Sequence, residues 1–219
     1  MFSAERKLSP QYLTAPLAYN LAELVVHSGA LQEGDFTFSS GIKSPLKIEL
    51  DVLRSRENFQ VHRDLSECMF IMMHELEMKP DVVVGVIRGG VSFARDLSSF
   101  WKKPFAARLG IKRDDERKKE VRGTIDEGAQ VLVVEDVVTF GTNSIPCVLD
   151  LRGIDKANVL GVISVYDHGF FRAREGFKEN CIPHWSLLYF QDLINVLRRS
   201  GKDVGRFEDW HASISSSLV

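Results

Sequence analysis

Apolar residues mark out segments along the chain that alternate between helix and strand. Intervals of three and four residues between apolar positions are typical of an amphipathic helix. Helices are expected at Pro16–Ser28, Phe59–Met78, Val91–Phe100, Ile145–Leu151 and about Asp192–Arg199. Short apolar runs are typical of strands buried on both faces. Such strands are expected at Val82–Val86, Phe105–Leu109, Val131–Val134, Val159–Tyr166 and Ser186–Phe190.

This alternation predicts an α/β fold, with a mostly parallel twisted sheet flanked by helices. A smaller layer precedes the sheet, because alternation at Phe36–Phe38 and Leu46–Leu50 predicts a hairpin. We expect one domain over residues 1–219, with an N-terminal segment at about 16–55, a core at about 56–200 and a tail at 201–219. The tail is expected to fray over Ser213–Ser217.

Composition narrows the class of protein. Hydrophobic residues make up 44% and charged residues 26% of the 219 residues, as in a globular protein in water. The net charge of −2 gives no support to bulk nucleic-acid binding. The three cysteines form no CxxC pair, so neither a disulfide framework nor a structural zinc site is expected. No apolar run approaches a membrane span and no signal peptide is recognisable, so we predict a cytoplasmic protein without nucleic-acid or membrane partners.

The segment Val131–Ser144 carries the strongest indication of chemistry. Its apolar run ends on Glu135 and Asp136, and a loop with hydroxyl and glycine residues then leads into a helix. Free N–H groups at a helix N-terminus favour an anion such as phosphate. Adjacent acids suit sugar hydroxyls or a hydrated Mg²⁺. The segment therefore predicts a site that holds a phosphorylated sugar from both ends.

The same segment carries a resemblance to a known family. Residues Glu135–Ser144 read EDVVTFGTNS and resemble the phosphoribosyl-pyrophosphate (PRPP) loop of type I phosphoribosyltransferases. Residues Phe36–Pro45 resemble the N-terminal signature of orotate phosphoribosyltransferases, where the segment forms part of a hood over the base. The resemblance extends over roughly Leu17–Leu197. It implies the type I fold and Mg²⁺-dependent transfer of a phosphoribosyl group from PRPP to orotate, which gives orotidine 5′-monophosphate and pyrophosphate in pyrimidine synthesis. It also implies a homodimer.

The resemblance further implies which residues bind PRPP. Glu135 and Asp136 would be catalytic residues that hold ribose hydroxyls or metal-bound waters, while the loop after them grips the 5′-phosphate. Arg88-Gly89-Gly90 would line the pyrophosphate, often through a non-proline cis peptide in the family. The implied PRPP-binding set is Glu135, Asp136, Val137, Val138, Thr139, Phe140, Gly141, Thr142, Asn143, Ser144, Arg88, Gly89 and Gly90. No direct protein ligand to Mg²⁺ is expected, because PRPP and water would hold the ion.

The charged stretch Lys112–Arg122 stands where the family has its catalytic loop. Lys112 and Arg113 would be catalytic cations there, because positive charge stabilises the departing pyrophosphate. The acids at Asp114–Glu116 depart from the family pattern and would repel that anion.

The candidate base-binding residues are Lys47, Ile48, Thr139 and Asp167. Lys47 stands where the family commonly has an aromatic residue, and Tyr166-Asp167-His168 stand where it has an arginine that helps to recognise orotate. Another nucleobase is therefore an open alternative. A non-catalytic PRPP- or nucleotide-sensing paralogue is a second. A generic nucleotide-binding α/β protein is disfavoured, because neither GxxxxGK[ST] nor GxGxxG appears.

Overall fold

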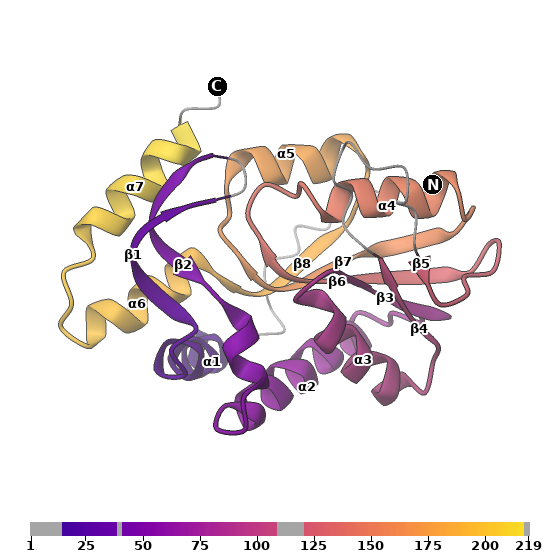
Figure 1. Ribbon diagram of the computed structural model, residues 1–219, viewed down its shortest axis with the longest axis horizontal. Coiled ribbons are helices and arrows are strands. Elements are labelled where there is room, and N and C mark those ends of the chain that lie inside the picture. Colours follow the sequence, from indigo (N-terminus) through magenta and orange to yellow (C-terminus); the bar gives the residue numbers. More distant parts are fainter. Residues whose placement is uncertain (1–14, 39–40, 109–120, 217–219) are drawn as a thin grey trace.

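A six-stranded sheet forms the centre of the protein (Figure 1). The computed structural model describes residues 15–38, 41–108 and 121–216. Within these ranges the strand order is β5-β4-β3-β6-β7-β8, with β5 antiparallel to β4 and all other neighbours parallel. The strands are β3 (Val82–Val86), β4 (Phe105–Arg108), β5 (Val121–Arg122), β6 (Gln130–Val138), β7 (Asn158–Asp167) and β8 (His184–Tyr189). The predicted mostly parallel sheet is thus confirmed.

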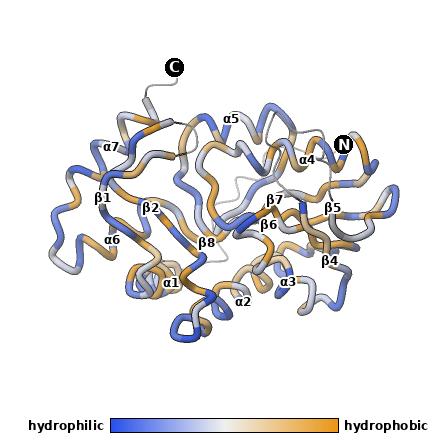
Figure 2. The backbone as a smooth tube through the Cα atoms, in the orientation of Figure 1, coloured by the Kyte–Doolittle hydropathy of each residue, from blue (hydrophilic) through white to orange (hydrophobic). Residues whose placement is uncertain are grey.

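Helices cover both faces of this sheet (Figure 1). One face carries α1 (Ala15–His27), α2 (Phe59–Glu75) and α3 (Gly90–Trp101), and the other carries α4 (Ser144–Gly153) and α5 (Phe171–Glu179). In β6, Leu132 and Val134 pack with the first group of helices, whereas Val131 and Val133 pack with the second. Burial on both faces explains the continuous apolar runs of these strands, which stand out in Figure 2.

A second layer stands at the carboxyl end of the sheet (Figure 1). It contains the antiparallel hairpin of β1 (Leu31–Thr37) and β2 (Lys43–Ile48), together with α6 (Phe190–Arg199) and α7 (Gly205–Ser216). Leu46 of the hairpin packs with Phe190, Ile194 and Phe207 of these helices in a separate apolar cluster. We call this hairpin the hood.

The structure corrects several predicted bounds. Each hood strand begins earlier than predicted, and Leu50 starts the short 3-10 helix Leu50–Arg54 in place of ending a strand. Helix α5 was not predicted, because only Ala173 and Phe177 along it are buried. Fraying over Ser213–Ser217 was wrong as far as Ser216, because α7 extends to that residue. Across the described ranges, every helix is too short or too polar to cross a bilayer.

Candidate active site

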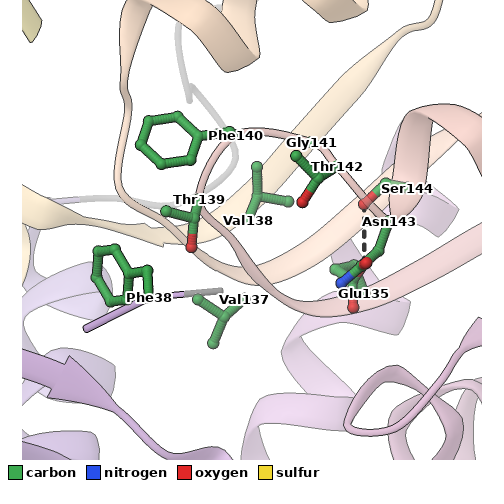
Figure 3. A pocket seen from close by; sticks show the side chains of 10 residues that line it. All are labelled: Phe38, Glu135, Val137, Val138, Thr139, Phe140, Gly141, Thr142, Asn143 and Ser144. Carbon is green, nitrogen blue, oxygen red and sulfur yellow. Dashed lines mark hydrogen bonds between the residues drawn. The ribbon is translucent and has the colours of Figure 1, made fainter. Parts of the chain in front are cut away.

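The loop between β6 and α4 forms one side of a pocket at the carboxyl end of the sheet. Gly141 has a φ of +70°, in the left-handed region that favours glycine, and turns the chain towards α4. The first N–H groups of a helix have no partner within it, so the start of α4 offers donors to an anion. Figure 3 shows the residues that line the pocket. They are Phe38, Glu135, Val137, Val138, Thr139, Phe140, Gly141, Thr142, Asn143 and Ser144.

Glu135 is the buried acid of this pocket, with 3% of its surface exposed. The Ser144 hydroxyl donates a hydrogen bond to Glu135 Oε2 at 2.9 Å, so the strand end and the helix start are joined directly (Figure 3). Burial raises the pKa of Glu135 well above its ordinary value, and repulsion by the neighbouring Asp136 raises it further. Burial also raises the pKa of the Asp136 carboxyl. The raised pKa values show that ionising both carboxyls is costly at this buried position. A partner that supplies hydroxyl donors or positive charge would lower that cost, so the pair favours such a partner.

The loop between β3 and α3 reaches the same two acids. A Cβ atom added to Gly89 would lie 1.7 Å from Asp136 Oδ2, and one added to Gly90 would lie 2.3 Å from the Val134 carbonyl oxygen. Only glycine therefore permits this approach of the two loops. The Ile87-Arg88 peptide is cis, as the resemblance led us to expect for this loop. The structure thus brings together Arg88-Gly89-Gly90 and the segment Glu135–Ser144, which lie far apart in the sequence.

The candidate base-binding residues are not gathered in the same way. Thr139 lines the pocket, whereas Lys47 pairs with Glu49 and Ile48 belongs to the apolar core. Asp167 accepts a hydrogen bond from the Gly169 N–H at 2.8 Å and lies outside the pocket lining. Burial raises the pKa of Asp167 to about 6. The catalytic-loop candidates Lys112 and Arg113 lie outside the described residues.

Phe38 is a pocket residue that sequence reasoning did not select. It sits on the hood beside Val137 and Thr139, on the side of the pocket away from Ser144 (Figure 3). Its ring lies 5.5 Å from that of His168, edge to face. Its place next to the predicted hairpin turn could have identified it, because that hairpin was expected to cover a ligand.

His168 and Phe170 form an aromatic stack behind Phe38. Their rings are 5.1 Å apart and nearly parallel, and Phe170 stacks in turn on Phe140, in the loop between β6 and α4, at 5.2 Å. Burial lowers the pKa of His168 to about 3, so its ring is neutral at pH 7. His168 therefore supplies an aromatic surface and no charge.

The same geometry bears on metal binding. Among the described ranges, no group of three or more His, Cys, Asp or Glu side chains is placed to hold a metal ion by itself. The acid pair Glu135 and Asp136 nonetheless fits a hydrated cation that other oxygens also hold, because positive charge would offset two carboxylates at a partly water-free site.

Comparison with known proteins identifies the family of this chain. A model described as phosphoribosyl transferase domain matches residues 57–169, just over half of the chain. The orotate phosphoribosyltransferase of Staphylococcus haemolyticus is 28% identical over 183 residues, 82% of this chain and 89% of that protein. The Aeropyrum pernix orotate phosphoribosyltransferase structure has a TM-score of 0.66 at 24% identity, covering 83% of this chain and 98% of that one.

A larger enzyme shares the fold as well. The structure of Leishmania donovani UMP synthase has a TM-score of 0.75 at 18% identity, and the match covers 92% of this chain. It covers 42% of that chain, so this protein spans less than half of that enzyme. From the domain match and the shared architecture, the chain belongs to the phosphoribosyl transferase family and has the type I phosphoribosyltransferase fold.

Proposed function

We propose that the protein transfers a phosphoribosyl group from PRPP to orotate, in a Mg²⁺-dependent reaction that yields orotidine 5′-monophosphate and pyrophosphate. The observation that carries the proposal is the convergence of three elements on the acid pair that follows the apolar part of β6. The start of α4 reaches Glu135 through Ser144, and the Gly89-Gly90 loop lies against Asp136. The names of the curated relatives support orotate as the acceptor.

Each element corresponds to one part of PRPP. The 5′-phosphate would bind the backbone N–H groups and hydroxyls of Thr139–Ser144. The ribose hydroxyls would meet Glu135 and Asp136, and the pyrophosphate would lie along Arg88-Gly89-Gly90. Because the chain ligates PRPP along its whole length in this arrangement, it would hold the anomeric carbon in a fixed position for attack.

The reaction needs no protein nucleophile. The bond from the anomeric carbon to pyrophosphate breaks with its electron pair leaving on the pyrophosphate oxygen. A ring nitrogen of the base donates an electron pair to that carbon, and the proton of that nitrogen passes to solvent water. In its ionised form the acid pair would stabilise the positive charge that develops on the sugar, and the Arg88 side chain would offset charge on the leaving group. Bound Mg²⁺ would offset further charge on PRPP, with Glu135 and Asp136 as the protein groups near it.

A different nucleobase is the second candidate acceptor. Orotate carries a carboxylate, and the described pocket lining contains no lysine or arginine. Lys47 is engaged by Glu49, and Arg172 lies with its guanidinium carbon 5.7 Å from the centre of the Phe140 ring. The homodimer and the cytoplasmic location stay predictions from the resemblance and the composition.

Pyrophosphate release separates these candidates. The protein is mixed with PRPP, Mg²⁺ and, in turn, orotate, uracil, adenine, hypoxanthine and guanine. Release with orotate alone supports the proposal, and release with another base alone replaces the acceptor. PRPP binding without release from any base would instead indicate a sensing protein.

A further inference from the structure

Helix α7 joins the hood to the core of the protein. Figure 1 shows α7 alongside the β1–β2 hairpin, and it also contacts β2 and α5. Glu33 of β1 pairs with Lys202, which precedes the helix, and with Arg206 in its first turn. Phe207 on its inner face is 1% exposed. The hood is therefore held by a helix that lies more than 150 residues away in the sequence.

Trp210 contacts the hood at the end of β1 and at the start of β2. Its indole N–H donates a hydrogen bond to the carbonyl oxygen of Lys43, the first residue of β2, at 2.8 Å. Its ring lies 6.2 Å from that of Phe38 and 6.0 Å from that of His168, both edge to face. Trp210 thus contacts both sides of the hood turn, the backbone of Lys43 in β2 and the ring of Phe38 just after β1.

His211 fixes the same stretch of α7 to the core. Its Nε2 lies 2.5 Å from the carbonyl oxygen of His168, and its ring stacks on that of Phe190 at 4.0 Å. Burial lowers the pKa of His211, which favours a neutral ring that carries its proton on Nε2 towards the carbonyl. Trp210 is therefore anchored relative to the loop after β7, and the hood is anchored to Trp210.

Among the described residues, Phe38 has few hydrogen bonds and ring contacts. Its backbone bonds stay within its own turn, where the Phe38 N–H donates to Ile42 O at 2.9 Å and its carbonyl accepts from the Gly41 N–H at 2.8 Å. Within the described ranges, its ring contacts with other aromatic side chains are those with His168 and Trp210. The position of the Phe38 ring at the pocket thus depends on the loop after β7 and on α7.

We propose that Trp210 is a positioning residue that holds Phe38 at the acceptor side of the pocket and thereby sets the affinity for the base. The inference rests on the proposed function, because it places the phosphates at the α4 end and the base at the Phe38 end. The phosphates of PRPP would bind groups that Trp210 does not touch. Loss of Trp210 should therefore weaken binding of the base and leave PRPP binding nearly unchanged.

Two substitutions separate the hydrogen bond from the ring contacts. Trp210→Leu removes both, and Trp210→Phe keeps an aromatic ring and removes the donor. We expect the KM for orotate to rise roughly ten-fold in Trp210→Leu and by less in Trp210→Phe. The KM for PRPP should change less than about two-fold, and kcat should stay close to that of the wild type. Trp101→Phe is the matched control, because Trp101 packs on Phe70 at 5.1 Å, away from the pocket.

Amide hydrogen exchange tests the role of Trp210 in the absence of any substrate. Amide hydrogen exchange at Phe38 and Lys43 should quicken in Trp210→Leu, while exchange in β3 and β6 stays at the wild-type rate. Unchanged exchange at the hood turn, or equal rises in the two KM values, would overturn the role of Trp210. A wild-type protein that does not turn over orotate would contradict the proposed function, and the exchange result would still decide whether Trp210 holds the hood.

Discussion

Gly89 shows how closely the two halves of the candidate site approach each other at the scale of single residues. Its backbone has φ −69° and ψ −37°, a conformation open to any residue. Only the missing side chain distinguishes it, because an added Cβ would overlap the Asp136 carboxylate. The requirement for glycine here comes from the contact between the loops and not from the backbone angles.

A glycine series tests this contact. Gly89→Ala should displace Asp136 and lower kcat/KM for PRPP by about a hundred-fold, with a small loss of thermal stability. Gly90→Ala should mainly lower the melting temperature, because its Cβ would meet the Val134 carbonyl, which belongs to the core strand. Gly153→Ala is the matched control, since nothing lies within 4 Å of its Cβ and alanine favours helix by about 0.5–1 kcal/mol. Full activity in Gly89→Ala would contradict the arrangement.

Asp167 predicts a dependence of stability on pH. Its pKa is raised to about 6 by burial, from an ordinary value of 3.8. Between these values the folded state binds more protons than the unfolded state, so this group lowers the free energy of unfolding as pH rises. Asp167→Asn removes that loss and can still accept the bond from Gly169. The variant should gain stability relative to the wild type between about pH 4 and pH 6. Urea unfolding at several pH values measures this gain, and a difference that does not vary with pH would refute it.

At the scale of elements, how well the sequence predicts a segment depends on where its packing partners lie. The strands of the sheet are buried on both faces, so their own residues carry the pattern, as in Val82–Val86. Helix α7 packs through Phe207 and Trp210 on a hairpin far away in the sequence, and its few apolar residues did not lead to a predicted helix. The hood strands pair through an irregular register between Glu33 and Phe36, which alternation alone did not locate.

How much of the candidate site the sequence predicts also depends on how far apart its residues lie along the chain. Glu135–Ser144 is one continuous segment, and its strand, acids, loop and helix start occur in order, so the sequence was enough to find it. The aromatic cluster of Phe38, His168 and Trp210 draws on three distant segments. None of these carries a pattern that names its partners, because such contacts arise only when the chain folds.

Two ion pairs of similar length, one buried and one exposed, allow a test of how burial changes the contribution of an ion pair to stability. Arg108 Nη2 lies 2.5 Å from Asp150 Oδ2 and joins β4 to α4, with 4% of the arginine side chain exposed. Arg198 Nη2 lies 2.6 Å from Glu208 Oε1 and joins α6 to α7, with both side chains more than 40% exposed. Asp150→Ala leaves the buried Arg108 with the longer ion pair to Asp155, at 3.6 Å, and should cost about 3 kcal/mol of unfolding free energy. Glu208→Ala should cost under about 1 kcal/mol. Denaturant unfolding measures both, and equal costs would contradict this account.

At the scale of the whole molecule, the pocket lies between the sheet and the hood. The sheet supplies the acid pair and the loops after β3 and β6, and the hood supplies Phe38. Helix α7 lies beside the hood hairpin, so elements from near both ends of the described chain lie side by side (Figure 1). Under the proposed function, this division would place PRPP at the sheet and the acceptor base at the hood.

The formation of orotidine 5′-monophosphate tests the central claim most directly. Wild-type protein and the Asp136→Asn variant are incubated with PRPP, Mg²⁺ and orotate, and the nucleotide product is measured by chromatography. We expect the wild type to form the product and Asp136→Asn to form it at least about a hundred-fold more slowly, because the acid pair would lose its interaction with the developing positive charge on the sugar. Equal rates in the two proteins, or no product from the wild type, would contradict the account.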